Sequence, residues 1–116
     1  MEPDVERRML GLIGLGVRGR LVVVGVDRVR EAARSGTLRF AVIAADASHH
    51  SREKVERLLT AKGVPTASIA SAATLGAAVG RDSTAAIGVV DGKLATGIRA
   101  LLESGTAMQS GSRRNG

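Results

Sequence analysis

The sequence contains no cysteine, which excludes disulfide bonds, thiolate nucleophiles and zinc sites built on cysteine. Aromatic residues are almost as scarce, because Phe40 is the only one among 116 residues. Modules that stack unpaired bases on phenylalanine, tyrosine or tryptophan are therefore disfavoured. Recognition of a structured RNA through its backbone and base edges remains open.

Long apolar runs are also missing. No stretch approaches the roughly 18 consecutive apolar residues that predict a membrane span. The chain begins Met1-Glu2-Pro3-Asp4, which is acidic where a secretory signal would be basic. We therefore expect a cytoplasmic protein with no membrane partner. With 116 residues, 44% of them hydrophobic, the chain is long enough for one domain with a core and too short for two.

Positive charge is abundant. Seventeen basic residues against eleven acidic ones give a net charge of +6, and most of the basic residues are arginine, whose planar guanidinium suits phosphates and guanine edges. Residues 18–39 hold six arginines but only two carboxylates, Asp27 and Glu31. This distribution favours a polyanionic partner. The alternative is that the arginines only keep the protein surface solvated and bind no partner.

The segment from Arg20 to Ser48 predicts a strand, a helix and a second strand. Residues 21–24 and 38–44 are short apolar runs, as expected for buried strands. Between them, apolar residues recur at three- and four-residue spacing, and Gly36 then ends the helix. The inward positions are Val26, Val29, Ala32 and Ala33.

The same patterns predict the rest of the chain. We expect Asp4 to cap a helix over residues 5–17, whose glycines allow close packing. Ser48 or Ser51 is expected to cap a further helix, which ends at Lys62-Gly63. We expect a strand over residues 64–69, placed at a sheet edge or strand start by Pro65. Further elements follow: a short helix capped by Ser71, a strand over residues 85–90, a turn at Asp91-Gly92 and a helix over residues 93–103.

Alternation of helices and short apolar strands predicts an α/β fold, with one sheet covered by helices on both faces as an α/β/α sandwich. Residues 1–103 form the single domain. Residues 104–116, which include Arg113-Arg114, offer almost nothing to bury, and we expect a disordered basic tail.

A glycine motif at residues 14–19, Gly-Leu-Gly-Val-Arg-Gly, matches the G-x-G-x-x-G pattern of dinucleotide-binding folds. In those folds the glycines follow a strand and open a helix, and an acidic residue follows about 20 positions later. Here a helical pattern precedes the glycines, a strand follows them, and residues 33–40 contain no carboxylate. The sequence therefore disfavours a nucleotide cofactor, and we expect none.

A second polar cluster surrounds His49-His50. Adjacent histidines without a spaced third ligand do not make a metal site, so we expect no bound metal. Asp46, Ser48, His50 and Ser51 contain the residue types of a catalytic triad, but they are crowded into one turn. Turn and helix-capping roles explain them, and we expect no enzymatic activity.

Several segments, in order and spacing, resemble a known family. They are Leu10-Gly11-Leu12, Arg18-Gly19-Arg20-Leu21-Val22, Gly25, residues 32–36 and 41–48, Gly63-Val64-Pro65, and residues 75–80 and 85–89. Together they resemble the ribosomal protein L-seven-Ae superfamily, which includes the L-thirty-e, S-twelve-e and Gadd types and small bacterial YlxQ-like proteins. The resemblance covers roughly residues 5 to 102 and implies an α/β/α sandwich around a four-stranded mixed sheet.

The resemblance also implies a binding surface. Family members typically bind RNA, often a kink-turn, through the N-terminus of the helix after the first strand and the loop before the last strand. Here these surfaces are residues 25–31 and 79–85. The implied RNA-binding residues are Arg20, Gly25, Asp27, Arg28, Glu31, Arg34, Arg81 and Thr84, with Arg30 as a further phosphate contact.

The chain departs from the family pattern at the helix start. RNA-binding members usually have a polar pair such as Asn-Glu there and a lysine one turn later, where this chain has Asp27, Arg28 and Glu31. The two carboxylates have the wrong sign for phosphate, although a carboxylate can accept a hydrogen bond from a guanine or cytosine amino group.

The functional prediction is a non-catalytic protein that binds structured RNA, such as ribosomal RNA or a kink-turn, on the ribosome or during its assembly. One alternative is a protein-interaction module of the same fold that has lost RNA contact, which the acidic substitutions would permit. Another is a small-molecule or enzymatic domain that uses the glycine-rich segment.

Overall fold

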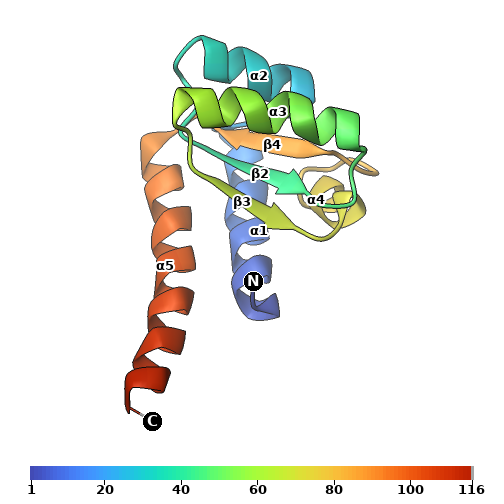
Figure 1. Ribbon diagram of the computed structural model, residues 1–116. Helices are drawn as coiled ribbons and strands as arrows, with labels where there is room; N and C mark the ends of the chain where they lie inside the picture. Colours follow the sequence, from blue (N-terminus) through green and yellow to red (C-terminus); the bar gives the residue numbers. More distant parts are fainter. Residues whose placement is uncertain (116) are drawn as a thin grey trace.

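The computed structural model describes the backbone of residues 1–115 and the side chains of residues 1–104. Helices and strands alternate along this part of the chain (Figure 1). Their order is α1 (Pro3–Arg18), β1 (Val22–Val24), α2 (Val26–Arg34), β2 (Phe40–Ala44), α3 (His49–Lys62), β3 (Thr66–Ile69), α4 (Ala72–Ala78), β4 (Ala86–Val89) and α5 (Gly92–Asn115).

The strands form one mixed sheet in the order β1-β4-β2-β3. Strand β4 is antiparallel to both β1 and β2, whereas β3 is parallel to β2. Consequently β1, β2 and β3 all end at the edge where β4 begins, and we call this end of the sheet the carboxyl edge. The opposite end, where β1, β2 and β3 begin and β4 ends, is the amino edge. Strand β3 is an outer strand, as Pro65 predicted.

Helices cover both faces of the sheet, which confirms the predicted sandwich. Helices α2 and α3 lie on one face, and α1, α4 and α5 lie on the other (Figure 1). The side chains of β2 show why both layers are needed. Phe40, Val42 and Ala44 pack toward α1, α4 and α5, whereas Ala41 and Ile43 pack toward α2 and α3. A strand buried on both faces requires the uninterrupted apolar run seen in the sequence.

Serine caps fix the starts of two helices, as predicted. The Ser48 hydroxyl accepts a hydrogen bond from the Ser51 N–H at 3.2 Å, and the Ser71 hydroxyl accepts one from the Thr74 N–H at 3.1 Å. Gly63 ends α3 in the left-handed conformation, with φ of 67°. Local sequence therefore determines both ends of α3.

Two of the predicted helix starts differ from the structure. The cap prediction for Asp4 is wrong, because α1 begins at Pro3, a residue whose fixed φ suits the first helical position. Asp4 instead lies in the first turn and forms ion pairs with Arg7 and, at 3.1 Å, with Arg8. Asp91, predicted as part of a turn, caps α5 by accepting a hydrogen bond from the Leu94 N–H at 2.8 Å.

The glycine motif lies at the end of α1 and not at the start of a helix. A Cβ at Gly14 would come within 2.9 Å of the Ala78 carbonyl, and one at Gly16 within 2.5 Å of Leu94 Cδ2. Close packing is therefore confirmed for these two glycines, whereas a Cβ at Gly11 would meet no atom within 4 Å. The motif packs α1 against α4 and α5 and has no geometry for cradling a pyrophosphate.

The last helix starts one residue before its predicted start. The sequence predicted a disordered tail over residues 104–116. The side chains from residue 105 onward lie outside the described part of the chain, so the disorder remains a prediction. None of the helices, over the part of the chain that the structure describes, combines the length and apolar content needed to cross a bilayer.

Candidate functional site

Gly25 forms the junction between β1 and α2 at the carboxyl edge. Its φ of 99° lies in the region that favours glycine. The Gly25 N–H donates to the Ala86 carbonyl at 2.9 Å, and the Gly25 carbonyl accepts from the Val29 N–H at 3.0 Å. No side chain caps α2. The N–H groups of its first turn and the positive end of its dipole therefore lie at the carboxyl edge without a hydrogen bond from a capping side chain.

The loop between α4 and β4 is held against α4 by its own backbone. The Arg81 N–H donates to the Gly76 carbonyl at 2.8 Å, and the Thr84 N–H donates to the Ala72 carbonyl at 3.0 Å. Gly76 allows this close approach, since a Cβ there would lie 2.5 Å from the Ser83 Cα. The loop is thus a fixed surface beside the start of β4.

These two segments are neighbours because β1 and β4 pair in antiparallel fashion. Val24 is opposite Ile87, and the Gly25–Ala86 hydrogen bond extends the pairing by one residue. The α2 N-terminus, with exposed Asp27 and Arg28, therefore shares the carboxyl edge with the loop that contains exposed Arg81 and half-buried Thr84. Glu31 is exposed about one turn further along α2.

Arg20 and Arg34 lie elsewhere. Arg20 comes just before β1, and Arg34 is the last residue of α2, which runs back along the sheet. Both therefore lie at the amino edge, and the structure does not bring them to the α2 N-terminus. Arg30 lies in the middle of α2 and is half buried, near His50 and Arg57 of α3. Of the predicted arginines, Arg28 and Arg81 lie at the carboxyl edge.

Comparison with known proteins identifies the family. Residues 8–97 match the Ribosomal protein L7Ae/L30e/S12e/Gadd45 family. The chain belongs to this family. This confirms the resemblance drawn from the sequence, including its YlxQ-like character. Over 92 residues the chain is 30% identical to the RNA-binding protein YlxQ of Bacillus subtilis (strain 168), an alignment that covers 79% of this chain and 92% of YlxQ.

Solved structures share the fold of this L7Ae-family chain. The structure of a protein of unknown function from Bacillus halodurans C superposes on this chain with a TM-score of 0.75 and 26% sequence identity. The match covers 82% of this chain and 96% of the Bacillus halodurans chain. The Giardia lamblia 15.5kD RNA binding protein also has a TM-score of 0.75, at 22% identity, over 90% of this chain and 92% of its own. At that identity the Giardia structure supports the fold alone.

The polar cluster near His50 serves to start helices in this family member. Ser48 caps α3, Asp46 accepts a hydrogen bond from the Ala72 N–H at 2.7 Å, and His49 Nε2 lies 3.4 Å from Glu53 Oε2. Among the described residues, no hydrogen bond links His50 to either serine, and no three histidine, aspartate or glutamate side chains gather as a metal site. The cluster has the capping geometry that the sequence suggested.

Sequence reasoning overlooked a group of cations at the amino edge. Arg39 precedes β2, Lys62 ends α3 and Arg99 lies on α5, yet all three line one cleft. Lys62 and Arg99 are far apart in the sequence, and only the sheet topology brings them together. The sequence held one signal for this group. Arg39 and Lys62 come shortly before β2 and β3, and the starts of parallel strands lie at the same edge of a sheet.

Proposed function

We propose that this protein binds structured RNA, without catalysis, through the carboxyl edge of its sheet. The observation behind the proposal is the hydrogen-bonded junction of Gly25 with Ala86, which sets an uncapped helix N-terminus beside the fixed loop at residues 80–85. Backbone N–H groups and a helix dipole attract phosphate. The family assignment and the likeness to a protein named as RNA-binding support the same function.

Each residue of the surface has a distinct proposed role. Gly25 leaves the α2 N-terminus open to a phosphate, and the exposed Arg28 and Arg81 supply guanidinium groups at the same edge. Thr84, whose hydroxyl donates to the Ala86 carbonyl at 3.1 Å, holds the loop in position. Asp27 and Glu31 accept hydrogen bonds from base amino groups and so favour particular bases over a bare phosphate backbone.

The finer proposal concerns the partner and its location. A chain of the ribosomal protein L7Ae/L30e/S12e/Gadd45 family with net charge +6 suits ribosomal RNA, a kink-turn or another folded RNA in the cytoplasm. We propose that no cofactor or metal takes part. The competing proposal is a protein-interaction module that has lost RNA contact, and the carboxylates Asp27 and Glu31 favour it.

The test is RNA affinity measured by fluorescence anisotropy at several salt concentrations, with a ribosomal RNA fragment and a kink-turn RNA. Arg28→Glu is expected to weaken binding about tenfold or more at low salt, a loss of roughly 1.4 kcal/mol. Arg7→Glu on α1 is the control, since Arg7 is exposed and lies in the layer on the far side of the sheet. Its affinity should fall much less.

The outcomes separate the two proposals. Steep weakening of wild-type binding as salt rises supports phosphate contacts. No wild-type binding at the lowest salt would favour the protein-interaction module. Equal losses in the Arg28 and Arg7 variants would remove the α2 N-terminus from the interface.

A further inference from the structure

The two ends of the sheet differ in charge. The segments that turn at the carboxyl edge, residues 25–28, 45–48, 70–72 and 79–85, contain two arginines and three aspartates. The segments that turn at the amino edge, residues 18–21, 34–39, 62–65 and 90–93, contain six cations and one carboxylate, Asp91. Most of the positive charge that flanks the strands therefore lies at the end opposite the expected RNA site.

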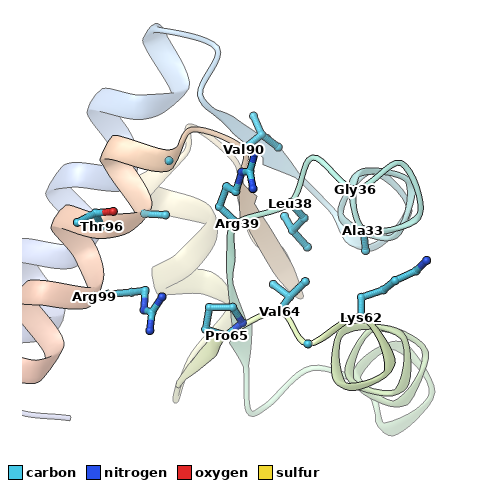
Figure 2. A pocket seen from close by; sticks show the side chains of 13 residues that line it. Ala33, Gly36, Leu38, Arg39, Lys62, Val64, Pro65, Val90, Thr96 and Arg99 are labelled. Atoms are coloured by element: carbon cyan, nitrogen blue, oxygen red, sulfur yellow. The ribbon is translucent and has the colours of Figure 1, made fainter.

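A cleft of about 590 Å³ opens at this amino edge. Its walls are the end of α2, the segment before β2, the end of α3 and one face of α5. Figure 2 shows Arg39 and Arg99 toward the α5 side and Lys62 at the end of α3 on the other side. The volume lies within the range of ligand sites in proteins, roughly 300–1,000 Å³.

The three cations of the cleft have no acidic partner within it. None of the described residues that line the cleft is an aspartate or a glutamate. Asp91, which stands between the lining residues Val90 and Gly92, is engaged in capping α5 through the Leu94 N–H. The ion pairs found among the described residues involve Arg7, Arg8 and Arg57, and none involves Arg39, Lys62 or Arg99. Three cationic side chains without an acidic partner in the same cleft favour the binding of an anion.

The surroundings of the cleft favour a chain of phosphates over a single anion. Arg34 follows the lining residue Ala33, and Lys93 follows the lining residue Gly92. Arg18 and Arg20 add charge at the start of β1 along the same edge. A lone nucleotide or phosphate could engage only the three cations of the cleft, whereas a nucleic acid backbone is long enough to reach these further cations at the same edge of the sheet as well.

We propose that the Arg39–Lys62–Arg99 cleft binds the phosphodiester backbone of RNA as a second contact surface. The proposal rests on the RNA-binding function proposed above and assigns this surface to the same partner. The two surfaces lie at opposite ends of β2, whose five residues span about 17 Å. The protein thus holds two segments of a folded RNA, one at each end of the sheet.

The experiment compares three variants of the full chain. The cleft variant Arg39→Gln/Lys62→Gln/Arg99→Gln removes three exposed cations. The control variant Arg7→Gln/Arg8→Gln/Arg57→Gln removes the same charge from α1 and α3, outside the cleft. The carboxyl-edge variant is Arg28→Gln/Arg81→Gln. Circular dichroism melting verifies that each variant folds, and the dissociation constant for a folded ribosomal RNA fragment is measured by anisotropy at four or more KCl concentrations.

The readout is the slope of log Kd against log salt. Each lost phosphate contact lowers the slope by about 0.7 to 0.9, so the cleft variant should lose about 2 to 3 and the control variant much less. Equal slopes for the cleft and control variants would overturn the cleft proposal.

Two kinds of competing ligand are tested as well. If a poly-glutamate peptide binds the wild type, fails to bind the cleft variant and leaves RNA affinity unchanged, this result assigns the cleft to a protein partner and overturns the proposal. Inorganic phosphate and ATP are titrated in parallel, and cleft-dependent binding of either without any change in RNA slope would also overturn it.

Failure of the cleft proposal is distinguishable from failure of the proposed function. If the wild type binds RNA and only the carboxyl-edge variant is weakened beyond the control, the proposed function holds and the cleft proposal fails. If only the cleft variant is weakened, the cleft proposal holds and the carboxyl edge is not the RNA site. If the wild type binds no RNA at low salt, both proposals fail.

Discussion

Gly76 is the residue on which the position of the loop before β4 depends. A Cβ at this position would lie 2.5 Å from the Ser83 Cα and 2.7 Å from its nitrogen, and backbone atoms cannot rotate away as a side chain can. The loop contains Arg81 and Thr84, so a single small residue in α4 controls the shape of half of the proposed RNA surface.

We predict that Gly76→Ala lowers the free energy of unfolding by about 1–3 kcal/mol, as overpacking typically does. It should also weaken RNA binding, because the loop must move away from α4. The free energy is measured by urea denaturation and the affinity by anisotropy.

The matched control is Gly11→Ala, an exposed helical site where a Cβ meets no atom within 4 Å. This change should raise the free energy of unfolding by roughly 0.5–1 kcal/mol and leave RNA affinity unchanged. A Gly76→Ala protein as stable as the wild type would contradict the packing described for the loop.

Among the elements, α5 completes the core on the face of the sheet that also packs α1 and α4. Ile98 is fully buried, and Ala95 is 4% exposed. Its start is fixed by Asp91, and its first turns also line the cleft. The helix therefore contributes both to stability and to the charge of the amino edge.

We predict that Ile98→Ala lowers the free energy of unfolding by about 2–5 kcal/mol, the range for large-to-small changes in a core. The exposed neighbour Ala100 supplies the control, since Ala100→Ser should change stability by no more than about 0.5 kcal/mol. Chemical denaturation monitored by circular dichroism measures both. A small effect of the Ile98 change would mean that α5 does not belong to the core.

The elements themselves could be predicted from local sequence wherever a short-range signal was strong. Ser48, Ser71 and Gly63 act where their types suggested, and Pro65 precedes an outer strand. Asp4 and Asp91 were mispredicted for one reason. Aspartate fits both a helix cap and a neighbouring turn or first-turn position. Which of these it occupies depends on where the flanking helix begins, and packing decides that.

At the scale of the whole molecule, the sheet topology decides which charges act together. Arg20 and Gly25 are close in sequence but lie at opposite ends of β1, whereas Lys62 and Arg99 are far apart in the chain but line the same cleft. Local patterns indicate strands but not their order. The fold class and the closeness of residues 25–28 to the loop before β4 were therefore predictable with the help of the family resemblance, while the separation of Arg20 and Arg34 from these segments was not.

The most direct test of RNA binding through the sheet edges is an NMR titration of the ¹⁵N-labelled protein with a folded ribosomal RNA fragment. We predict that the largest amide shifts cluster at residues 25–28 and 81–84, with a second cluster at residues 36–39, 62–64 and 92–99. Shifts confined to α1, or the absence of shifts at low salt, would contradict this account.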